Sequence, residues 1–522
     1  MKKKIRNLIF ILILMIISSL PILFKNDAIV QGHDLNFHLH RILGVVDNIS
    51  ILKIIPVYYN YLNHFGYGNG LFYPDLFIYI PGILYKLGIS LINSYKIFIL
   101  IINLFSIISI KVCLKHITKD EKITKIGMIL YATSLYRFAD MYLRSALGES
   151  ITFAFLPLVI LGLYAIFYDD CKKGYYLTIG LIGLMSSHII TTYMIAYFII
   201  FFIIMNYKCL KEKERLKELI IQLVFSVLIT SFFWMPMIEQ LLIDKFNIDN
   251  YIKIFENCVP LWHIIIDFED MTEVGWFPPG IGLIYFIIIP FFIKTKKKSR
   301  FINNIFIIGI GSTLLSSLKI LWKIPLIYKL FSIIQFPWRL QSISTICFII
   351  VTCYFFNNTK NNKLIKITVI YTLFIFLVNC LFVYFFPTMG NNLYSDGIMY
   401  GEYLPIELKD NYKDIMEKYT NEKITYKYEN EKLIVDVIKK ADDIELPLIY
   451  YKGYIAKSNE NNLKITKSDK GLVKIKIKND IKRIIISYEG TTIKEIGEMI
   501  TIISTLFYFI IVKRSLKKIN NK

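Results

Sequence analysis

The chain is poor in the residues and motifs that mark many soluble enzymes. Its 522 residues include only seven cysteines and no C-x-x-C pair, so the sequence indicates neither a disulfide framework nor a zinc site. The cysteines fall mostly in or beside apolar segments, as expected of small buried hydrophobic side chains. Walker A, G-x-S-x-G, H-E-x-x-H and G-x-G-x-x-G patterns are also absent. Nucleotide-driven chemistry on the cytoplasmic side therefore has no support.

Apolar residues dominate instead. They make up 55% of the chain, and the mean hydropathy is +0.51, which is typical of a polytopic membrane protein in a lipid bilayer. The N-terminal stretch MKKKIRNLIFILILMIISSLPILF lacks an A-x-A-like cleavage pattern and predicts a retained anchor. The formal net charge is +21. Because the lysines cluster between apolar segments, as the positive-inside rule requires, we expect no nucleic-acid partner.

The apolar segments predict a multi-pass protein of the plasma membrane, with about 11 to 13 spans and both termini in the cytoplasm. Strongly basic connections are assigned to the cytoplasm, and the connections between them then lie outside. The run 73–112 must cross an odd number of times, so its Pro-containing part 73–92 is expected to be interfacial or re-entrant. The candidate spans are 8–24, one within 73–112, 125–136, 149–168, 175–190, 191–206, 219–236, 279–293, 302–318, 339–356, 367–386 and 496–512.

Composition divides the chain into three parts. Residues 1–386 form the multi-spanning domain, and 387–495 carry period-two segments (KLIVDVI, GLVKIKIK and KRIIISY) that are typical of half-buried strands. We expect a small extracytoplasmic β-domain there, a sandwich tethered by a final transmembrane helix and basic cytoplasmic tail within 496–522. The glycine-rich GYGNG at 66–70 predicts a flexible outer loop.

Polar and ionisable residues recur at the predicted outer ends of spans. Such groups are costly at membrane depth and are usually functional or paired. Snorkelling at the interface explains scattered Lys and Tyr better than it explains recurring carboxylates and arginines. We therefore predict a charged cavity on the outer face. Its residues are Asp34, His38, Arg41, Arg137, Asp140, Arg144, Glu149, His188, Glu239, Gln335, Trp338, Arg339 and Glu402.

The first motif is GHDLNFHLHRI. Helical spacing places Asp34, His38 and Arg41 on one face, where a general base would lie beside a cation. The adjoining apolar stripe predicts an amphipathic helix along the outer interface. His38 and His40 diverge on a helix, which argues against a paired metal site, and hydrogen bonding is the commoner role for each histidine.

Two further motifs carry arginines. In YRFADMYLRSALGES, Arg137 and Arg144 are a candidate clamp for a phosphate, since guanidinium groups bind phosphate oxygens bidentately. Asp140 would hold an arginine for the ligand or merely fix the loop. In QFPWRLQS, Trp338 and Arg339 suit a lipid phosphate headgroup but are also ordinary interface anchors.

These motifs resemble those of the GT-C superfamily of membrane glycosyltransferases. The stretch with Asp34, Phe37 and Arg41 is similar to D-P-x-F-x-x-R of oligosaccharyltransferase catalytic subunits, and LRSALGES is similar to their R-S-x-A-G-x-x-D-N-E. Over most of the chain, GHDLNFHLHRI, FYPDLFIYIPG, YRFADMYLRSALGE, QFPWR and GEYLP look like bacterial 6-pyruvoyl-tetrahydropterin-synthase-related membrane proteins, akin to proteins that glycosylate lipoteichoic acid.

The resemblance implies transfer of a sugar from a polyprenyl-phosphate-linked donor to a cell-envelope polymer or lipid on the outer face, with inversion at the anomeric carbon. Asp34 would accept the proton of the acceptor hydroxyl. Arg41, Arg137, Arg144 and Arg339 would bind the donor phosphate and stabilise the leaving group. No Pro follows Asp34 and no D-N-E completes the second stretch, so a divalent cation is compatible with the family but unsupported.

Two other functions fit parts of the sequence. A transporter for an anionic lipid-linked substrate would also place arginines at an interface, but it predicts polar groups through the midplane and repeated broken helices. The cytoplasmic halves of the spans are instead nearly pure Ile, Leu and Phe. A binding or assembly protein would use the β-domain to bind cell-wall polymer and the spans as anchors, which leaves Asp34 and the arginines without a role.

Overall fold

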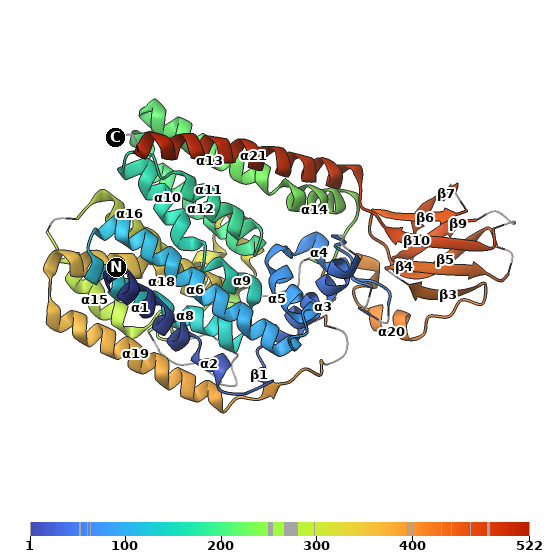
Figure 1. The fold of residues 1–522 in the computed structure, drawn as a ribbon, viewed down its shortest axis with the longest axis horizontal. Coiled ribbons are helices and arrows are strands. Elements are labelled where there is room, and N and C mark those ends of the chain that lie inside the picture. Colours follow the sequence, from blue (N-terminus) through green and yellow to red (C-terminus); the bar gives the residue numbers. More distant parts are fainter. Residues whose placement is uncertain are drawn as a thin grey trace.

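A computed structural model describes residues 2–51, 54–59, 61–62, 64–248, 254–265, 280–296, 298–393, 397–398, 401–429, 431–439, 441–459, 461–477 and 481–520. A helical bundle occupies most of the molecule, and a region of antiparallel strands lies at one end (Figure 1). Both chain termini lie toward the opposite end of the bundle (Figure 1).

The N-terminal part up to residue 90 combines one strand with helices of very different length. Its elements are α1 (Lys2–Ser18), α2 (Leu20–Leu23), β1 (Ile29–Val30), α3 (Leu35–Ile51), α4 (Asn69–Phe72), the 3-10 helix η1 (Leu76–Ile78) and α5 (Tyr79–Lys86).

The next part is helical almost throughout. It contains α6 (Leu91–Thr118), α7 (Glu121–Ala132), α8 (Leu135–Phe138), the π-helix η2 (Ala139–Leu143), α9 (Leu147–Thr152), α10 (Leu156–Tyr168), α11 (Tyr175–Met185), α12 (Ile189–Met205), η3 (Tyr207–Lys211), α13 (Lys213–Ile229) and α14 (Ser231–Ile243).

The remaining helices of the bundle follow after residue 253. They are η4 (Ile254–Asn257), α15 (Leu283–Ile293), α16 (Arg300–Ser317), η5 (Lys319–Lys323), α17 (Pro325–Phe331), η6 (Ser332–Ile334), η7 (Pro337–Leu340), α18 (Gln341–Thr359) and α19 (Asn362–Tyr384).

The C-terminal part holds most of the strands and the last helix. It consists of β2 (Thr388–Met389), η8 (Ile406–Leu408), α20 (Tyr412–Glu417), β3 (Ile424–Glu429), β4 (Lys432–Val437), β5 (Asp443–Ile449), β6 (Tyr454–Ser458), β7 (Asn461–Leu463), β8 (Ile465–Lys467), β9 (Leu472–Lys476), β10 (Arg483–Tyr488) and α21 (Thr492–Asn520).

Several helix ends follow capping signals in the sequence. The Asp120 carboxylate accepts the backbone N–H of Ile123 at 3.0 Å and so begins α7, and the Asn361 side chain begins α19 in the same way. Between α6 and α7, Lys119 adopts a left-handed conformation (φ 54°), which ends α6 directly before this cap.

Five helical segments in the described part of the chain are long and apolar enough to cross a membrane: Leu91–Thr118, Leu147–Tyr168, Pro337–Thr359, Asn362–Tyr384 and Thr492–Lys513. A sixth crossing results if α13 and α14 count as one span. The sequence predicts more spans, about 11 to 13, because hydropathy counts apolar residues and does not give the length of each helix. Several apolar helices, such as α11 and α15, are shorter than a membrane-crossing helix.

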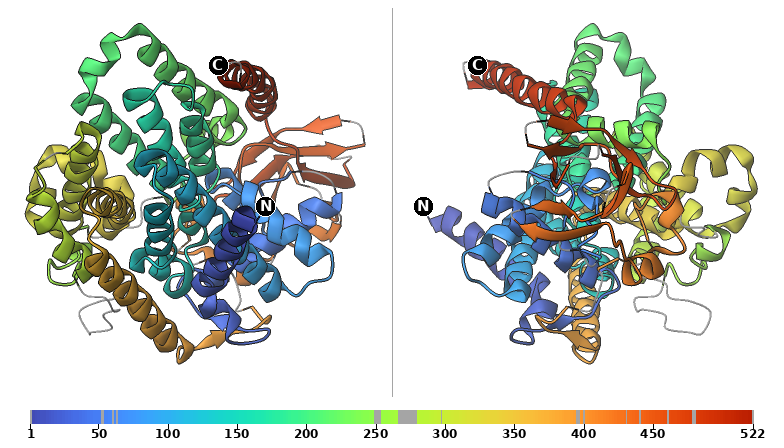
Figure 2. Two further views of the ribbon diagram at one scale, coloured as in Figure 1. Left: turned by 60° about the vertical axis from the view of Figure 1, so that its left-hand side comes forward. Right: turned by 90° about the vertical axis from the view of Figure 1, so that its right-hand side faces the viewer.

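The spans differ in how much of their surface the protein covers. In an apolar window of 18 residues within Pro337–Thr359 and within Thr492–Lys513, 89% and 17% of the residues, respectively, are buried inside the molecule. The first therefore lies in the centre of the bundle, whereas α21 runs along its edge (Figures 1 and 2). Exposed apolar residues on α21, such as Leu506 and Phe509, leave a surface suited to lipid.

The predicted span 219–236 is corrected by the structure. The chain bends by 67° between α13 and α14, at Thr230. The Thr230 hydroxyl donates to the Ser226 carbonyl at 2.8 Å, and the Ser231 hydroxyl bonds to the Gly497 carbonyl of α21 at 2.9 Å. These side chains satisfy backbone groups at the break, which an apolarity profile does not reveal.

The strands form antiparallel sheets. Their orders are β3-β4-β10-β6-β7 and β5-β9-β8, and β1 pairs separately with β2. Alternate residues are buried, for example Leu433 and Val435 of β4 with Ile484 and Ile486 of β10. This is the period-two pattern that the sequence shows.

The strands and the first inter-helix segment share one hydrophobic core. Gly68 allows this contact, since a Cβ atom there would lie 2.6 Å from the Tyr451 ring. GYGNG is therefore a packed segment, and the expected flexible loop is not found. Helix α3 is also buried on both sides, with Leu39 and Arg41 both almost fully covered, so it does not lie along an interface as an amphipathic helix.

Candidate functional site

The predicted site residues lie mostly on α3, at the strand-bearing end of the bundle, and on elements of the bundle itself. Figure 1 shows α3 next to the strands, with α5 and α9 farther into the bundle. The segment before α3 is fixed by two backbone bonds: the Gln31 N–H donates to the Pro387 carbonyl at 2.9 Å, and the Asp34 N–H donates to the Arg144 carbonyl at 2.8 Å. A Cβ at Gly32 would lie 2.2 Å from the Ser145 Oγ, so this close approach requires glycine.

Four charged residues form what we call the acid–arginine cluster: Asp140, Arg144, Glu149 and Arg339. The Arg144 Nη1 donates to Asp140 and, at 3.0 Å, to the Glu149 Oε2. The Arg339 Nε lies 3.7 Å from the same Glu149 oxygen. All four side chains are buried, so each charge depends on its neighbours for compensation.

Local structure builds this cluster. The π-helix η2 ends at Arg144, and Glu149 lies in the first turn of α9, where the Tyr136 hydroxyl donates to its Oε1 at 2.8 Å. On the other side, the Arg339 Nη1 donates to the Ile334 carbonyl at 3.0 Å and to the Gln335 Oε1 at 2.9 Å. Three separate chain segments therefore hold the two arginines against one carboxylate.

Asp34 lies beside this cluster and is partly exposed. Burial of its carboxyl group raises the pKa of Asp34, and the positive charges of Arg144 and Arg339 oppose that rise. In the part of the chain that the structure describes, no hydrogen bond to its carboxylate is found. The Asp34 carboxyl group is therefore available to a ligand.

Tyr73 occupies the centre of the site. Its ring lies under the Arg41 guanidinium, 3.9 Å from Cζ to ring centroid, and 5.9 Å from the rings of His38 and His188. Burial raises the pKa of Tyr73 to about 12, and Arg41 counteracts part of this rise. Gly148 is needed here, because a Cβ would lie 2.1 Å from the Tyr73 hydroxyl.

Burial favours the neutral form of both His38 and His188. The His188 Nδ1 accepts the Thr191 N–H at 3.3 Å and caps α12, and burial beside Arg339 lowers the pKa of His188 to about 3. Burial and the adjacent Arg41 hold the pKa of His38 well below its usual value. Neither histidine is placed to act as a cation near neutral pH.

Arg41 is fully committed to protein partners. Its guanidinium donates to the Asp75 Oδ1 at 2.6 and 3.2 Å, to the Pro74 carbonyl at 2.7 Å and to the His38 Nδ1 at 3.2 Å. The Tyr58 hydroxyl also donates to Asp75. This arrangement leaves little of Arg41 for a donor phosphate, and it instead fixes Tyr73 and Asp75.

Arg137 does not join Arg144. It is buried, donates to the Ala132 carbonyl at 2.9 Å and to the Asn103 side chain, and lies against the Tyr131 ring. Residues seven apart share one face of an α-helix, but η2 inserts a wider π-turn between these two arginines. The predicted two-arginine clamp is therefore not formed.

Two predicted acidic residues contact residues outside the acid–arginine cluster. Glu239 on α14 pairs with Lys452 at 2.9 Å and accepts the Thr491 hydroxyl, so it joins the strands to α14. Glu402 contributes its backbone carbonyl to the Tyr67 hydroxyl at 2.9 Å. Gln335 holds Arg339, and Trp338 is buried and stacked on Phe336 at 4.3 Å. These contacts are structural.

Sequence reasoning missed three residues of the site: Tyr73, Asp75 and Tyr403. Tyr73 and Asp75 belong to FYPDLFIYIPG, and Tyr403 belongs to GEYLP, both quoted above for their likeness to a known family. The Tyr403 ring stacks on Phe72 at 5.4 Å, which brings GEYLP over the site. The family resemblance of these two motifs could have identified the three residues. A search for charged residues at the outer ends of spans does not find them.

The donor set does not suit a divalent cation. No group of three or more His, Cys, Asp or Glu side chains able to hold a metal is found among the described residues. The Asp140 Oδ1 and the Glu149 Oε2 each accept a hydrogen bond from Arg144, so one oxygen of each carboxylate already has a cationic partner.

Comparison with known proteins gives limited information. No protein-family model matches the chain. The chain is 24% identical over 254 residues to a protein of Lactococcus lactis subsp. cremoris (strain MG1363) that is described as an uncharacterized protein. The match covers 46% of this chain and 41% of that protein. The chain thus matches less than half the length of this relative, and the comparison establishes no family.

Proposed function

We propose that the protein transfers a sugar from a polyprenyl-phosphate-linked donor to a hydroxyl group of a cell-envelope polymer or lipid, as a membrane glycosyltransferase of the GT-C type. One observation carries the proposal: the backbone N–H of Asp34 donates to the Arg144 carbonyl at 2.8 Å, which places the partly exposed Asp34 side chain beside the buried arginines of the acid–arginine cluster. A proton acceptor next to guanidinium groups is the combination that this reaction needs.

The reaction would proceed by displacement at the anomeric carbon. Asp34 takes the proton of the acceptor hydroxyl while the acceptor oxygen forms the new glycosidic bond. The bond between the anomeric carbon and the phosphate oxygen breaks, and polyprenyl phosphate leaves with the electron pair. Arg144 and Arg339 stabilise the negative charge of this phosphate in a site poor in water. No step is assigned to a divalent cation.

Arg41 has a different role in this proposal. Since Asp75, Pro74 and His38 occupy its guanidinium, it positions Tyr73 rather than binding the donor. Tyr73 then supplies an aromatic face and a hydroxyl beside Asp34, which are groups suited to contact a sugar ring.

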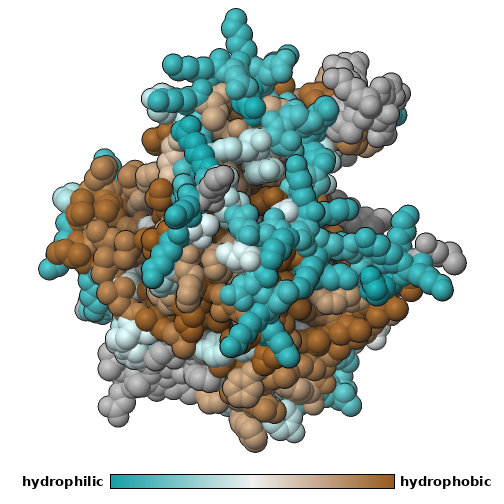
Figure 3. Space-filling view, turned by 90° about the vertical axis from the view of Figure 1, so that its left-hand side faces the viewer, coloured by the Kyte–Doolittle hydropathy of each residue, from teal (hydrophilic) through white to brown (hydrophobic). Residues whose placement is uncertain are grey.

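The charge distribution supports an outer active face. Hydrophilic side chains gather on the end of the molecule that faces away from the strands (Figure 3), and the basic connections Lys111–Lys125 and 206–218 belong to helix ends there. By the positive-inside rule this end is cytoplasmic. The acid–arginine cluster, at the strand-bearing end, then lies outside.

The test is transfer of label from a radiolabelled polyprenyl-phosphate sugar into envelope polymer by membranes that contain the protein. The native protein and Asp34→Asn are compared at equal abundance, with Asp414→Asn as a matched control, because Asp414 is an exposed carboxylate of α20. Loss of an essential proton acceptor should reduce the rate by about 100-fold or more, whereas the control should keep the native rate.

The outcomes separate the candidate functions. Loss of transfer in Asp34→Asn with retained donor binding supports the catalytic role. Equal labelling with Asp34→Asn removes Asp34 from the mechanism. If the native protein transfers no label from any donor beyond a deletion control, a binding or assembly function replaces the transferase.

A further inference from the structure

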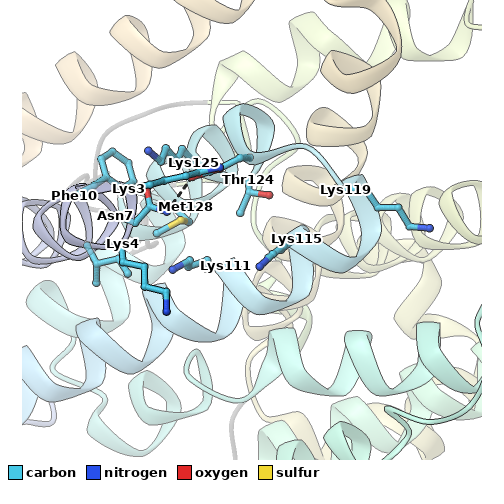
Figure 4. A pocket seen from close by; sticks show the side chains of 12 residues that line it. Lys3, Lys4, Asn7, Phe10, Lys111, Lys115, Lys119, Thr124, Lys125 and Met128 are labelled. Atoms are coloured by element: carbon cyan, nitrogen blue, oxygen red, sulfur yellow. Dashed lines mark hydrogen bonds and ion pairs between the residues drawn. The ribbon is translucent and has the colours of Figure 1, made fainter. Parts of the chain in front are cut away.

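A pocket lies at the end of the bundle that faces away from the strands. It has a volume of about 590 Å³ and is enclosed by α1, the last turns of α6 and the first turns of α7. This volume is within the range of small-molecule sites. Figure 4 shows Lys111 and Lys115 projecting from α6 into the space beneath α7.

The pocket has a strongly unbalanced charge. Six lysines line it, Lys3, Lys4, Lys111, Lys115, Lys119 and Lys125, and they face one carboxylate, Glu121. Glu121 pairs with Lys3 at 2.6 Å and accepts the Asn7 amide at 2.9 Å. Among the described residues, no carboxylate forms an ion pair with the other five lysines. An anionic ligand would relieve their mutual repulsion.

Helix dipoles do not explain these positions. Cations are favoured at helix C-termini, which accounts for Lys115 at the end of α6. Lys3 and Lys4 lie instead in the first turn of α1, at the positive end of its dipole, and Lys125 follows the first turn of α7. The N-terminus of α7 is already capped by the Asp120 carboxylate, so a phosphate group bound there would interact favourably with the lysines and with the N-terminus of α1.

The positive-inside rule explains why this end of the protein is basic. It does not explain why the lysines surround a pocket that also has an apolar wall. Phe10, Ile11 and Met128 contribute this wall, and the Lys125 ammonium lies 5.3 Å from the centroid of the Phe10 ring. Cationic and apolar groups side by side suit a ligand with a phosphate head and a hydrocarbon tail.

We propose that this pocket binds the phosphate headgroup of an anionic membrane lipid. The lysines of α6 bind the phosphate oxygens, and the wall formed by Phe10, Ile11 and Met128 contacts the start of the acyl chains. Because the site holds α1 against α6 and α7, bound lipid would stabilise the position of the N-terminal helix. The proposal is independent of the sugar-transfer reaction, which involves the opposite end of the molecule.

The test is titration of dioleoyl-phosphatidylglycerol into the full-length protein in a non-ionic detergent, with bound lipid counted by native mass spectrometry. The variant K111Q/K115Q should bind this lipid about 30-fold more weakly, since each lysine near an anionic headgroup contributes about 1 kcal/mol. K111R/K115R, which keeps both charges, should bind as the native protein does. Dioleoyl-phosphatidylcholine should bind at least tenfold more weakly than phosphatidylglycerol.

Further variants keep the test decisive. K363Q/K366Q removes two exposed lysines of α19 outside the pocket and should leave binding unchanged. K4Q/K125Q removes charge from α1 and α7 and should weaken binding even if K111Q/K115Q fails to fold. An equal loss in K363Q/K366Q, or equal binding of both lipids, would overturn the proposal. So would tight binding of inorganic pyrophosphate that phosphatidylglycerol does not displace, because the ligand would then be a soluble phosphate.

Discussion

The two ends of the bundle both carry many charges, but they arrange them in opposite ways. At the strand-bearing end, buried arginines are paired with carboxylates at 2.6 to 3.0 Å, as Arg41 with Asp75 and Arg144 with Glu149 show. At the other end, lysines surround an open pocket, and within the described part of the chain only Lys3 among them has a carboxylate partner. The charges at the strand-bearing end are therefore compensated within the protein, whereas a ligand or solvent compensates the lysines at the other end.

The choice of cation explains this difference. The planar guanidinium of Arg41 can donate to Asp75, Pro74 and His38 at once, which satisfies a buried charge. A lysine ammonium is more strongly hydrated and tolerates a position at the membrane surface. Arginine at one end therefore indicates fixed geometry, and lysine at the other indicates an electrostatic surface.

The strongest test of the comparison is the pair Glu149→Gln and Glu121→Gln. Glu149 is buried between Arg144 and Arg339, so loss of its charge removes the carboxylate beside Arg339 and one of the two beside Arg144, and should reduce the free energy of unfolding by about 3–5 kcal/mol. Glu121 is exposed and contacts Lys3, so its variant should unfold at the native midpoint. Unfolding in mixed detergent micelles measures both, and equal effects would contradict the comparison.

A smaller effect is expected from Arg41→Lys. Lysine keeps the charge but cannot donate to Asp75, Pro74 and His38 together, and the variant should lose about 2 kcal/mol of unfolding free energy. The matched change at the other end, Lys363→Arg, should have no measurable effect on unfolding in the same micelles. If Arg41→Lys is neutral, the fixed geometry of this end is not set by the guanidinium.

The pH dependence of transfer sharpens the comparison further. Asp34 must be ionised to accept a proton, and burial raises its pKa, so the rate should fall as the pH decreases through a value above about 4, the ordinary value for aspartate. The pH dependence of folding stability has the opposite sign. Because the pKa of Asp34 is raised in the folded protein, protonation of Asp34 stabilises the fold, and this contribution to stability is lost as the pH rises. Asp34→Asn should therefore stay folded at neutral pH while its residual transfer is independent of pH. A native rate that falls only below pH 4 would exclude the raised pKa.

The smallest effect is expected from Lys4→Gln. Lys4 is exposed and lines the lysine pocket, so its loss should leave the unfolding midpoint and sugar transfer unchanged. Only the salt dependence of phosphatidylglycerol binding should become weaker, since one cation fewer contacts the headgroup. A change in transfer would connect the two ends, which the comparison treats as separate.

Some features of the molecule follow directly from its sequence. Apolar length predicts α6, α18, α19 and α21, and period-two alternation predicts β4, β9 and β10. Local patterns do not reveal the turn type inside a helical stretch. The sequence therefore does not predict the π-helix Ala139–Leu143, which separates Arg137 from Arg144. Local patterns also do not reveal burial. In the sequence Tyr73 and Asp75 resemble ordinary interface residues, but in the fold Gly148 packs against Tyr73 and Arg41 binds Asp75.

The pairing of β1 with β2 has a consequence for the order in which the protein is made. Ile29 and Val30, just before Asp34, pair with Met389 and Thr388, which follow the helix α19. Most of the chain is synthesised between these two short strands. The segment that carries Asp34 therefore leaves the ribosome long before the strand that fixes it, and the site can assume its final geometry only late in membrane insertion.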